Sequence, residues 1–288
     1  MPGKNALVVC GPTAGGKSEL SDVLADGLTE SAGHHVPTLI VDSMQVYREL
    51  PVITNQARRR PAELVGIVSV TEEWSVARHK ARAEETIESG VTKHFVLDAG
   101  TGMYLNALLL DFPLAPRVSP EIRRLAKAEA ADEQNPRRAA RARELNLSGA
   151  RERGSVWEGE LRYDTTIVYL RPDRPQVDAA IAERSRRIAC DGQQEARLLR
   201  EMTEEGVKIS PQVMDSVGVR ELSMYLSGTL TLEQAEDRIS TRTRRFARRQ
   251  MRWFDKLIRT LEGRAKITVL QNSRQASNLH IMHDIIGV

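Results

Sequence analysis

The sequence of 288 residues contains only two cysteines, Cys10 and Cys190, and it lacks any long apolar run. Two cysteines are too few for a disulfide framework or a four-cysteine metal site, which favours a reducing compartment. No apolar run approaches the roughly 20 residues of a membrane-spanning helix. The first residues, Met-Pro-Gly-Lys-Asn, show no signal-peptide pattern. We therefore expect a cytoplasmic protein with no membrane partner.

The chain also lacks a strong net charge, because its 42 basic and 39 acidic residues give a net charge of +3. With 41% hydrophobic and 28% charged residues, the composition excludes an intrinsically disordered or collagen-like chain. At roughly 150 residues per domain, the length allows one large domain or two modest ones. The small net charge leaves a nucleic-acid partner open, because the distribution of the charge decides that question.

Short apolar runs alternate with helix-forming stretches along the chain. The runs that we predict as strands are 6–10, 38–41, 95–97, 166–170 and 267–270. The order strand, helix, strand, helix, strand over the first hundred residues predicts an α/β fold, with a parallel sheet that carries helices on both faces. Ligands of such sheets bind beyond the carboxyl ends of the strands. The residues that follow the first three runs are therefore expected at one edge of the sheet.

The composition changes between residues 113 and 162, where Ala, Arg and Glu dominate and large apolar residues are few. This composition predicts a small helical insertion. We accordingly expect a catalytic core formed by 1–112 and 163–288, with C-terminal helices, and a helical insertion at 113–162.

Residues 11–18, Gly-Pro-Thr-Ala-Gly-Gly-Lys-Ser, fit the phosphate-binding pattern Gly-x-x-x-x-Gly-Lys-Ser/Thr between a predicted strand and a predicted helix. Backbone N–H groups of such a loop and the positive end of the helix bind a chain of phosphates. Lys17 would neutralise phosphate charge, and the Ser18 hydroxyl would ligate Mg²⁺. The residues assigned to this diphosphate site are Gly11, Thr13, Ala14, Gly15, Gly16, Lys17 and Ser18. The loop alone does not identify the ligand, so a nucleotide kinase or NTPase is an alternative.

Polar residues follow the second and third apolar runs. Asp42 could be a Mg²⁺ ligand, a general base or a helix N-cap. Asp98 could also be a metal ligand, although the Ala-Gly that follows it suits a tight turn. Ser43, Gln45 and Thr101 could donate hydrogen bonds to a ligand at the same edge.

Residues 241–256 concentrate cationic charge. Neighbouring turns of the helix predicted there carry four arginines: Arg245, Arg248, Arg249 and Arg252. Its opposite face carries three apolar residues that can pack on the core: Phe246, Trp253 and Leu257. The arginine stripe is either a solvated helix face or an electrostatic footprint for the phosphates of a nucleic acid or a diphosphate.

In combination, these motifs resemble the tRNA dimethylallyltransferases, or isopentenyltransferases, which have a P-loop NTPase-like core. The matching segments are 11–18, Asp-Ser-Met-Gln-Val-Tyr-Arg at 42–48, Ala-Gly-Thr-Gly-Met-Tyr at 99–104, 217–221 and 243–254. The resemblance implies transfer of a dimethylallyl group from dimethylallyl diphosphate to N6 of an adenine, so that the loop holds a leaving diphosphate. The implied acceptor is the tRNA adenosine immediately 3′ of the anticodon, and we expect the enzyme to be a monomer.

The resemblance also implies roles for individual residues. Lys17 and the catalytic residues Thr13 and Arg220 would contact the diphosphate, while Mg²⁺ would bind Ser18. Asp42 would accept a hydrogen bond from the adenine amine and take its proton. In the family the adenine is flipped into a channel. The residues implied to line that channel or to touch the tRNA are Ser43, Met44, Gln45, Thr101, Arg123, Arg138, Arg141, Arg245, Arg248 and Arg249.

The chain departs from the family pattern in the insertion, which is short and only echoes an arginine motif at 135–141, Asn-Pro-Arg-Arg-Ala-Ala-Arg. After Arg48 the usual Asp-Ile-Gly-Thr-Ala-Lys-Pro is also replaced. Donor binding survives these changes better than tRNA binding. Free AMP, ADP or ATP is therefore an alternative acceptor, and a catalytically silent paralogue that binds tRNA is a further alternative.

Overall fold

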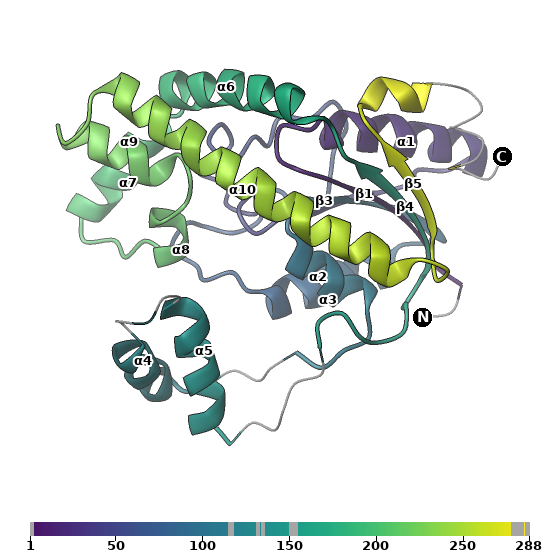
Figure 1. The fold of residues 1–288 in the computed structure, drawn as a ribbon, viewed down its shortest axis with the longest axis horizontal. Coiled ribbons are helices and arrows are strands. Elements are labelled where there is room, and N and C mark those ends of the chain that lie inside the picture. Colours follow the sequence, from purple (N-terminus) through teal and green to yellow (C-terminus); the bar gives the residue numbers. More distant parts are fainter. Residues whose placement is uncertain are drawn as a thin grey trace. The chain divides into compact units, whose positions relative to one another are not determined.

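A parallel sheet forms the centre of the larger of two units in the computed structural model (Figure 1). The residues that the structure describes are 3–114, 118–130, 133, 136–149, 155–277 and 285. The larger unit comprises Met1–Leu109 and Leu161–Val288, and the smaller one comprises Leu110–Glu160.

The sheet has five strands in the order β2-β3-β1-β4-β5, and every neighbouring pair is parallel. The strands are β1 (Asn5–Cys10), β2 (Thr38–Val41), β3 (His94–Ala99), β4 (Asp164–Leu170) and β5 (Lys266–Leu270). In the register of the sheet, Cys10 pairs with Ala99 of β3, and Ala99 also pairs with Val41 of β2. The ends of β1, β2 and β3 therefore lie at one edge, and the predicted parallel α/β sheet is confirmed.

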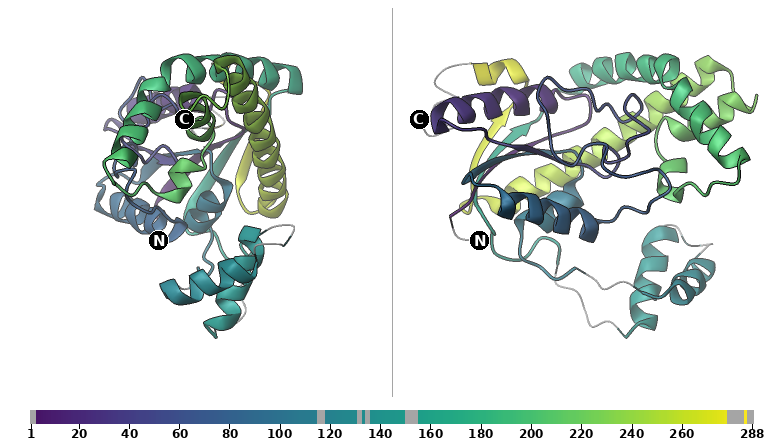
Figure 2. Two further views of the ribbon diagram at one scale, coloured as in Figure 1. Left: turned by 90° about the vertical axis from the view of Figure 1, so that its left-hand side faces the viewer. Right: turned by 180° about the vertical axis from the view of Figure 1, so that it is seen from behind.

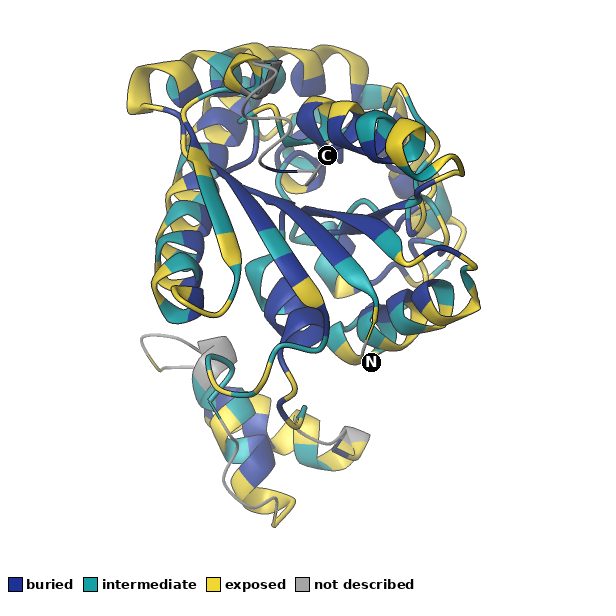
Figure 3. Cartoon of the chain, turned by 90° about the vertical axis from the view of Figure 1, so that its right-hand side faces the viewer, coloured by how far each residue is buried: buried dark blue, intermediate teal, exposed yellow. Residues whose placement is uncertain are grey.

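Helices surround this sheet in the larger unit (Figures 2 and 3). They are α1 (Lys17–Ala32), α2 (Val76–Ser89), α3 (Gly102–Leu109), α6 (Arg174–Asp191), α7 (Gln193–Glu204), α8 (Pro211–Met214), α9 (Val219–Leu226) and α10 (Leu232–Leu261), followed by the 3₁₀ turn Ser273–Ser277. Side chains of β1 alternate between the two faces of the sheet. Leu7 and Val9 accordingly join Leu20 and Leu24 of α1 in one apolar cluster.

The longest helix of the larger unit, α10, has 30 residues and packs against α6 and α9. A capping box begins it, in which Thr231 and Gln234 exchange side-chain to backbone hydrogen bonds. Its buried positions recur every three or four residues: Ala235, Ile239, Thr243, Ala247, Gln250, Phe254, Leu257 and Leu261. This spacing confirms the predicted helix that ends near Leu261. It leaves Arg245, Arg248, Arg249 and Arg252 exposed, whereas Arg242 and Arg244 are partly buried.

The smaller unit contains α4 (Pro120–Glu129) and α5 (Pro136–Leu147), which pack against each other. Ser119 caps α4 by accepting a hydrogen bond from the Ile122 N–H. The unit that contains these two helices spans Leu110–Glu160. Among all the helices described in both units, none is long and apolar enough to cross a membrane.

Candidate active site

The glycine loop joins the end of β1 to the first turn of α1. A Cβ at Gly11 would lie 2.5 Å from the Leu170 carbonyl oxygen. Only glycine therefore allows the loop to pass this close to the end of β4. Gly16 has a φ of +84° where α1 begins, which again suits glycine. The Lys17 ammonium bends back and donates to the Pro12 carbonyl at 2.9 Å. The structure thus has the strand, loop and helix that the phosphate-binding pattern requires.

Two cations lie beside this loop. Lys17 is one of them, and desolvation lowers its pKa although Asp98 and Asp42 oppose that shift. The other is Arg184 of α6, whose Nη1 donates to the Thr13 hydroxyl at 2.9 Å. Desolvation lowers the pKa of Arg184 to about 10. Arg184 was not predicted, because α6 carries four arginines and nothing in their spacing distinguishes this one.

Asp42 follows β2 directly, and its two carboxylate oxygens have different surroundings. Oδ1 accepts hydrogen bonds from the Met44 and Gln45 N–H groups at 2.8 and 3.3 Å. Oδ2 faces the Thr101 hydroxyl at 3.5 Å. Burial raises the pKa of Asp42, while the two N–H donors and then the cations Lys17 and Arg184 counteract that shift. The chain turns after Asp42 without starting a helix, so Oδ1 caps a turn and the helix N-cap alternative is wrong.

The residues that follow β3 lie beside Asp42. The Thr101 hydroxyl accepts a hydrogen bond from the Ser43 N–H at 3.1 Å. A Cβ at Gly100 would lie 2.5 Å from Asp42 Oδ2, so a glycine is needed beside the carboxylate. The Gln45 side-chain oxygen is buried and has no hydrogen-bond partner among the described residues, which leaves an acceptor available to a ligand. The predicted residues Asp42, Ser43 and Thr101 are therefore brought together.

Gln250 of α10 connects the glycine loop to the residues that follow β3. Its Oε1 accepts from the Thr13 N–H and its Nε2 donates to the Gly100 carbonyl, both at 2.7 Å. Gln250 was not predicted, because it lies among arginines in the sequence. A signal was available, because residue 250 continues the buried spacing of α10 and a polar residue there needs a partner.

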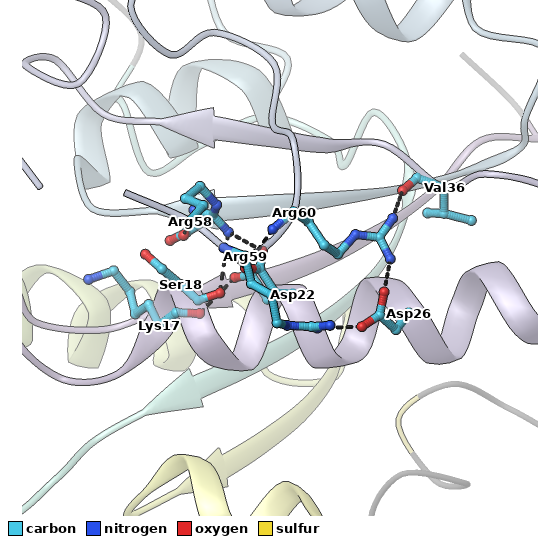
Figure 4. Close-up of polar contacts among 10 residues, drawn as sticks. Lys17, Ser18, Asp22, Asp26, Val36, Arg58, Arg59 and Arg60 are labelled. Carbon is cyan, nitrogen blue, oxygen red and sulfur yellow. Dashed lines mark hydrogen bonds and ion pairs between the residues drawn. The ribbon is translucent and has the colours of Figure 1, made fainter. Parts of the chain in front are cut away.

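The Asp98 carboxylate is paired with an arginine in this structure. Its Oδ2 lies 2.5 Å from Arg58 Nη1, and Arg58 Nη2 lies 2.8 Å from Asp22 Oδ1. All three side chains are at most 4% exposed. Next to them, Arg59 and Arg60 both pair with Asp26 (Figure 4). We call these six residues the Arg58 cluster, and we assign Asp98 to it because Arg58 occupies the carboxylate that a metal would need.

The remaining predicted residues are distributed more widely. Arg245, Arg248 and Arg249 are exposed on α10. Arg220 is exposed at the start of α9 and lies 3.3 Å from the Asp215 carboxylate. In the smaller unit, Glu144 pairs with Arg141 at 2.6 Å and with Arg123 at 4.0 Å. The side chain of Arg138 lies outside the described residues.

Comparisons with known proteins add to this geometry. The family model described as IPP transferase matches residues 45–257. The tRNA dimethylallyltransferase of Rubrobacter xylanophilus is 57% identical over 290 aligned residues, which cover 100% of each chain. The tRNA dimethylallyltransferase of Rickettsia bellii strain RML369-C is 29% identical and covers 97% of this chain and 98% of its own.

Two solved structures share the fold. The full-length tRNA isopentenylpyrophosphate transferase of Bacillus halodurans superposes with a TM-score of 0.71 at 25% identity, covering 99% of this chain and 96% of its own. A tRNA delta(2)-isopentenylpyrophosphate transferase of Staphylococcus epidermidis gives 0.68 at 22% identity, covering 99% and 98%. The sheet with its glycine loop is thus a P-loop NTPase-like core. By its family match and its full-length 57% identity, the chain is a prenyltransferase of the IPP transferase family.

Proposed function

We propose that this prenyltransferase transfers a dimethylallyl group from dimethylallyl diphosphate to N6 of the tRNA adenosine 3′ of the anticodon. The observation that carries the proposal is the junction made by Gln250, which ties the phosphate-binding loop at Thr13 to the turn that holds Asp42 and Thr101. A site for a diphosphate and a carboxylate suited to accept a proton are thereby fixed next to each other. The names of the relatives support tRNA as the acceptor.

On the donor side, the loop from Gly11 to Ser18 presents backbone N–H groups and the N-terminus of α1 to the diphosphate. Lys17 supplies positive charge, and the Thr13 hydroxyl supplies a further hydrogen bond. Arg220 stays a predicted ligand, and it would leave its exposed pair with Asp215 to reach the diphosphate.

Mg²⁺ would bind on the donor side mainly through the phosphates of the prenyl donor. No group of three His, Cys, Asp or Glu side chains within the described ranges could hold a metal ion. Mg²⁺ is commonly bound by one or two protein oxygens together with substrate phosphates and water. The Ser18 hydroxyl, in the first turn of α1, would provide the protein oxygen, because Asp98 is paired with Arg58. The ion would supply positive charge to the departing diphosphate.

On the acceptor side, Asp42 would act as the general base. The adenine N6 attacks C1 of the allyl group, the bond from C1 to the diphosphate oxygen breaks, and the N6 proton passes to Asp42 Oδ2. Thr101 and the two N–H donors to Oδ1 hold the carboxylate in place. Ser43, Met44 and the free side-chain oxygen of Gln45 would line the adenine site.

The tRNA backbone requires cations outside this pocket. The exposed arginines of α10 (Arg245, Arg248 and Arg249) would contact phosphates, as would those of the smaller unit: Arg123, Arg138 and Arg141. Such contacts make binding depend steeply on salt concentration. We place this reaction in the cytoplasm and assign it to a monomer; the two cysteines, both free, suit a reducing compartment.

Free AMP, ADP or ATP is the second candidate acceptor, and the short insertion is the observation in its favour. The relative from Rubrobacter xylanophilus aligns over its full length with this chain, so it has an insertion of similar size, and its name specifies tRNA. A short insertion therefore does not by itself favour a free nucleotide.

One assay separates the acceptors. The protein is incubated with dimethylallyl diphosphate and Mg²⁺, together with unmodified tRNA or with AMP, ADP or ATP, and the nucleosides are identified by mass spectrometry. We expect N6-dimethylallyladenosine in the tRNA reaction, and none when the adenosine 3′ of the anticodon is replaced by guanosine. Product from free nucleotide alone would support the second acceptor, and phosphate release from ATP without a prenyl donor would support a kinase or NTPase.

A further inference from the structure

Arg184 differs from the other inward-facing arginines of the larger unit in its partners. Arg58 pairs with two carboxylates, Arg242 lies 2.5 Å from Glu221, and Arg162 lies 2.6 Å from Glu84. The Arg184 guanidinium instead donates to a neutral hydroxyl, that of Thr13. Within the described part of the chain, no carboxylate lies within ion-pair distance of Arg184.

Lys17 of the same loop is in the same situation. Its hydrogen-bond partner is the neutral carbonyl of Pro12, and no carboxylate of the described residues forms an ion pair with it. Removing a cation from water without an opposite charge is costly, and proteins normally pair such groups. Asp42 attracts both cations from a distance but forms an ion pair with neither. Two neighbouring cations without a carboxylate in ion-pair contact therefore point to an anion that is not part of the chain.

The positions of these cations identify the class of anion. Both are next to a loop whose N–H groups suit phosphate oxygens, and Arg184 reaches Thr13 of this loop from α6. A guanidinium can donate two parallel hydrogen bonds to one phosphate group. Resting on the proposed function, we propose that Arg184 is a further catalytic residue, which binds the diphosphate of the prenyl donor together with Lys17.

The reaction itself gives Arg184 its catalytic effect. When N6 of the acceptor forms its bond to C1 of the allyl group, the electron pair of the breaking C1–O bond moves onto the diphosphate, and the N6 proton moves to Asp42. The negative charge on the diphosphate oxygen thus grows toward the transition state. A cation fixed beside that oxygen stabilises the transition state more than the bound donor.

Four variants test this role: Arg184→Gln, Arg184→Lys, Thr13→Val and the control Arg186→Gln. Arg186 lies on the same helix, and its pair with Glu183 is largely exposed. Binding of inorganic diphosphate with Mg²⁺ is measured by calorimetry, and kcat and KM are measured for donor and tRNA. We expect Arg184→Gln to weaken diphosphate binding about 10-fold or more and to lower kcat about 100-fold. KM for tRNA and the control variant should be unchanged.

These variants distinguish two roles for Arg184: positioning the Thr13 side chain, or supplying positive charge to the diphosphate. If Arg184 only holds the Thr13 side chain in place, Thr13→Val will lose as much diphosphate affinity as Arg184→Gln, and the proposal is overturned. If Arg184 supplies charge, Arg184→Lys will retain part of the affinity and Thr13→Val will lose less than Arg184→Gln. Unchanged diphosphate binding in Arg184→Gln also overturns the proposal.

The binding experiment is independent of the acceptor. A protein that binds diphosphate through Arg184 but does not modify tRNA would contradict the proposed function and leave this inference intact. Conversely, normal tRNA modification with unchanged diphosphate affinity in Arg184→Gln would contradict only the inference.

Discussion

The Arg58 cluster and the two donor-side cations, Lys17 and Arg184, adjoin the same glycine loop but are built in opposite ways. In the cluster, Arg58 is enclosed by Asp22 and Asp98, and it also donates to the Ser18 carbonyl of the loop at 3.3 Å. The donor-side cations have only neutral partners among the described residues. The cluster can therefore hold α1 and β3 in place without a ligand, whereas the donor-side cations are complete only when an anion binds.

This difference separates a structural role from a catalytic one. Breaking a buried ion pair typically costs about 3–5 kcal/mol, because the remaining charge is left uncompensated. Removing an unpaired cation carries no such penalty. Substitutions in the two regions should thus affect different quantities, the free energy of unfolding in the first and ligand binding or turnover in the second.

The largest effect on turnover is expected at Asp42, the proposed general base on the acceptor side. Asp42→Asn keeps an oxygen to accept from the Met44 and Gln45 N–H groups but cannot take the proton from N6. We expect kcat to fall by about 10²–10⁴-fold. Burial already disfavours the charged carboxylate, so the melting temperature at pH 7 should not fall. Full turnover in this variant would contradict the assignment of Asp42 as the base.

The Arg58 cluster should show the opposite pattern. Arg58→Met leaves two carboxylates buried without a cation, and we expect the free energy of unfolding to drop by about 3–5 kcal/mol in urea. Replacing Asp22 and Asp98 as well, by Asn and Leu, should restore part of the loss. If Arg58→Met keeps its stability but loses diphosphate binding, the distinction between the two regions is wrong.

A smaller effect is expected from pH, which should act on turnover through Asp42 and on stability through the Arg58 cluster. Because burial raises the pKa of Asp42, the base becomes protonated at a pH above the ordinary value of about 4. We expect kcat/KM to fall about tenfold per pH unit below that pKa. In the cluster, hydrogen bonds from Arg59 and Arg60 outweigh desolvation and lower the pKa of Asp26. Its contribution to stability is present above pH 4 and is lost as the pH falls through the lowered pKa.

The control for this titration is Asp26→Asn. This variant should lose acid-dependent stability and keep the pH profile of kcat/KM. A shifted activity profile in Asp26→Asn would show that the two regions titrate together.

The smallest effect is expected at the exposed end of the cluster. The Arg59 side chain is 60% exposed and its partner Asp26 is 38% exposed, so water and salt screen the pair. Arg59→Gln should leave both the melting temperature and diphosphate binding unchanged within error. A clear loss of stability would mean that the cluster acts as one unit that includes its exposed pair.

The sequence was sufficient where a local pattern determines the structure. The loop at 11–18 requires glycine at fixed positions, and the apolar runs alternate with helices, so the sheet and its loop could be predicted. Asp42 could be placed at the edge of the sheet because it directly follows a strand.

Residues whose roles depend on contacts across the chain could not be found in this way. Gln250 meets Thr13, which lies 237 positions away, and Arg184 meets the same residue from 171 positions away. Among 42 basic residues, only the fold shows which cations have an acidic partner. Asp98 illustrates the same limit, because its pair with Arg58 is invisible in the sequence.

The most direct test of this account compares urea unfolding of the wild type, Arg58→Met and Arg184→Gln, each with and without inorganic diphosphate and Mg²⁺. At a concentration 100 times the dissociation constant, bound diphosphate should stabilise the wild type by about 2.7 kcal/mol. We predict that Arg58→Met is less stable than the wild type but gains the same increment, and that Arg184→Gln is as stable as the wild type without diphosphate but gains much less. Equal increments in both variants, or an equal loss of stability without diphosphate, would contradict the account.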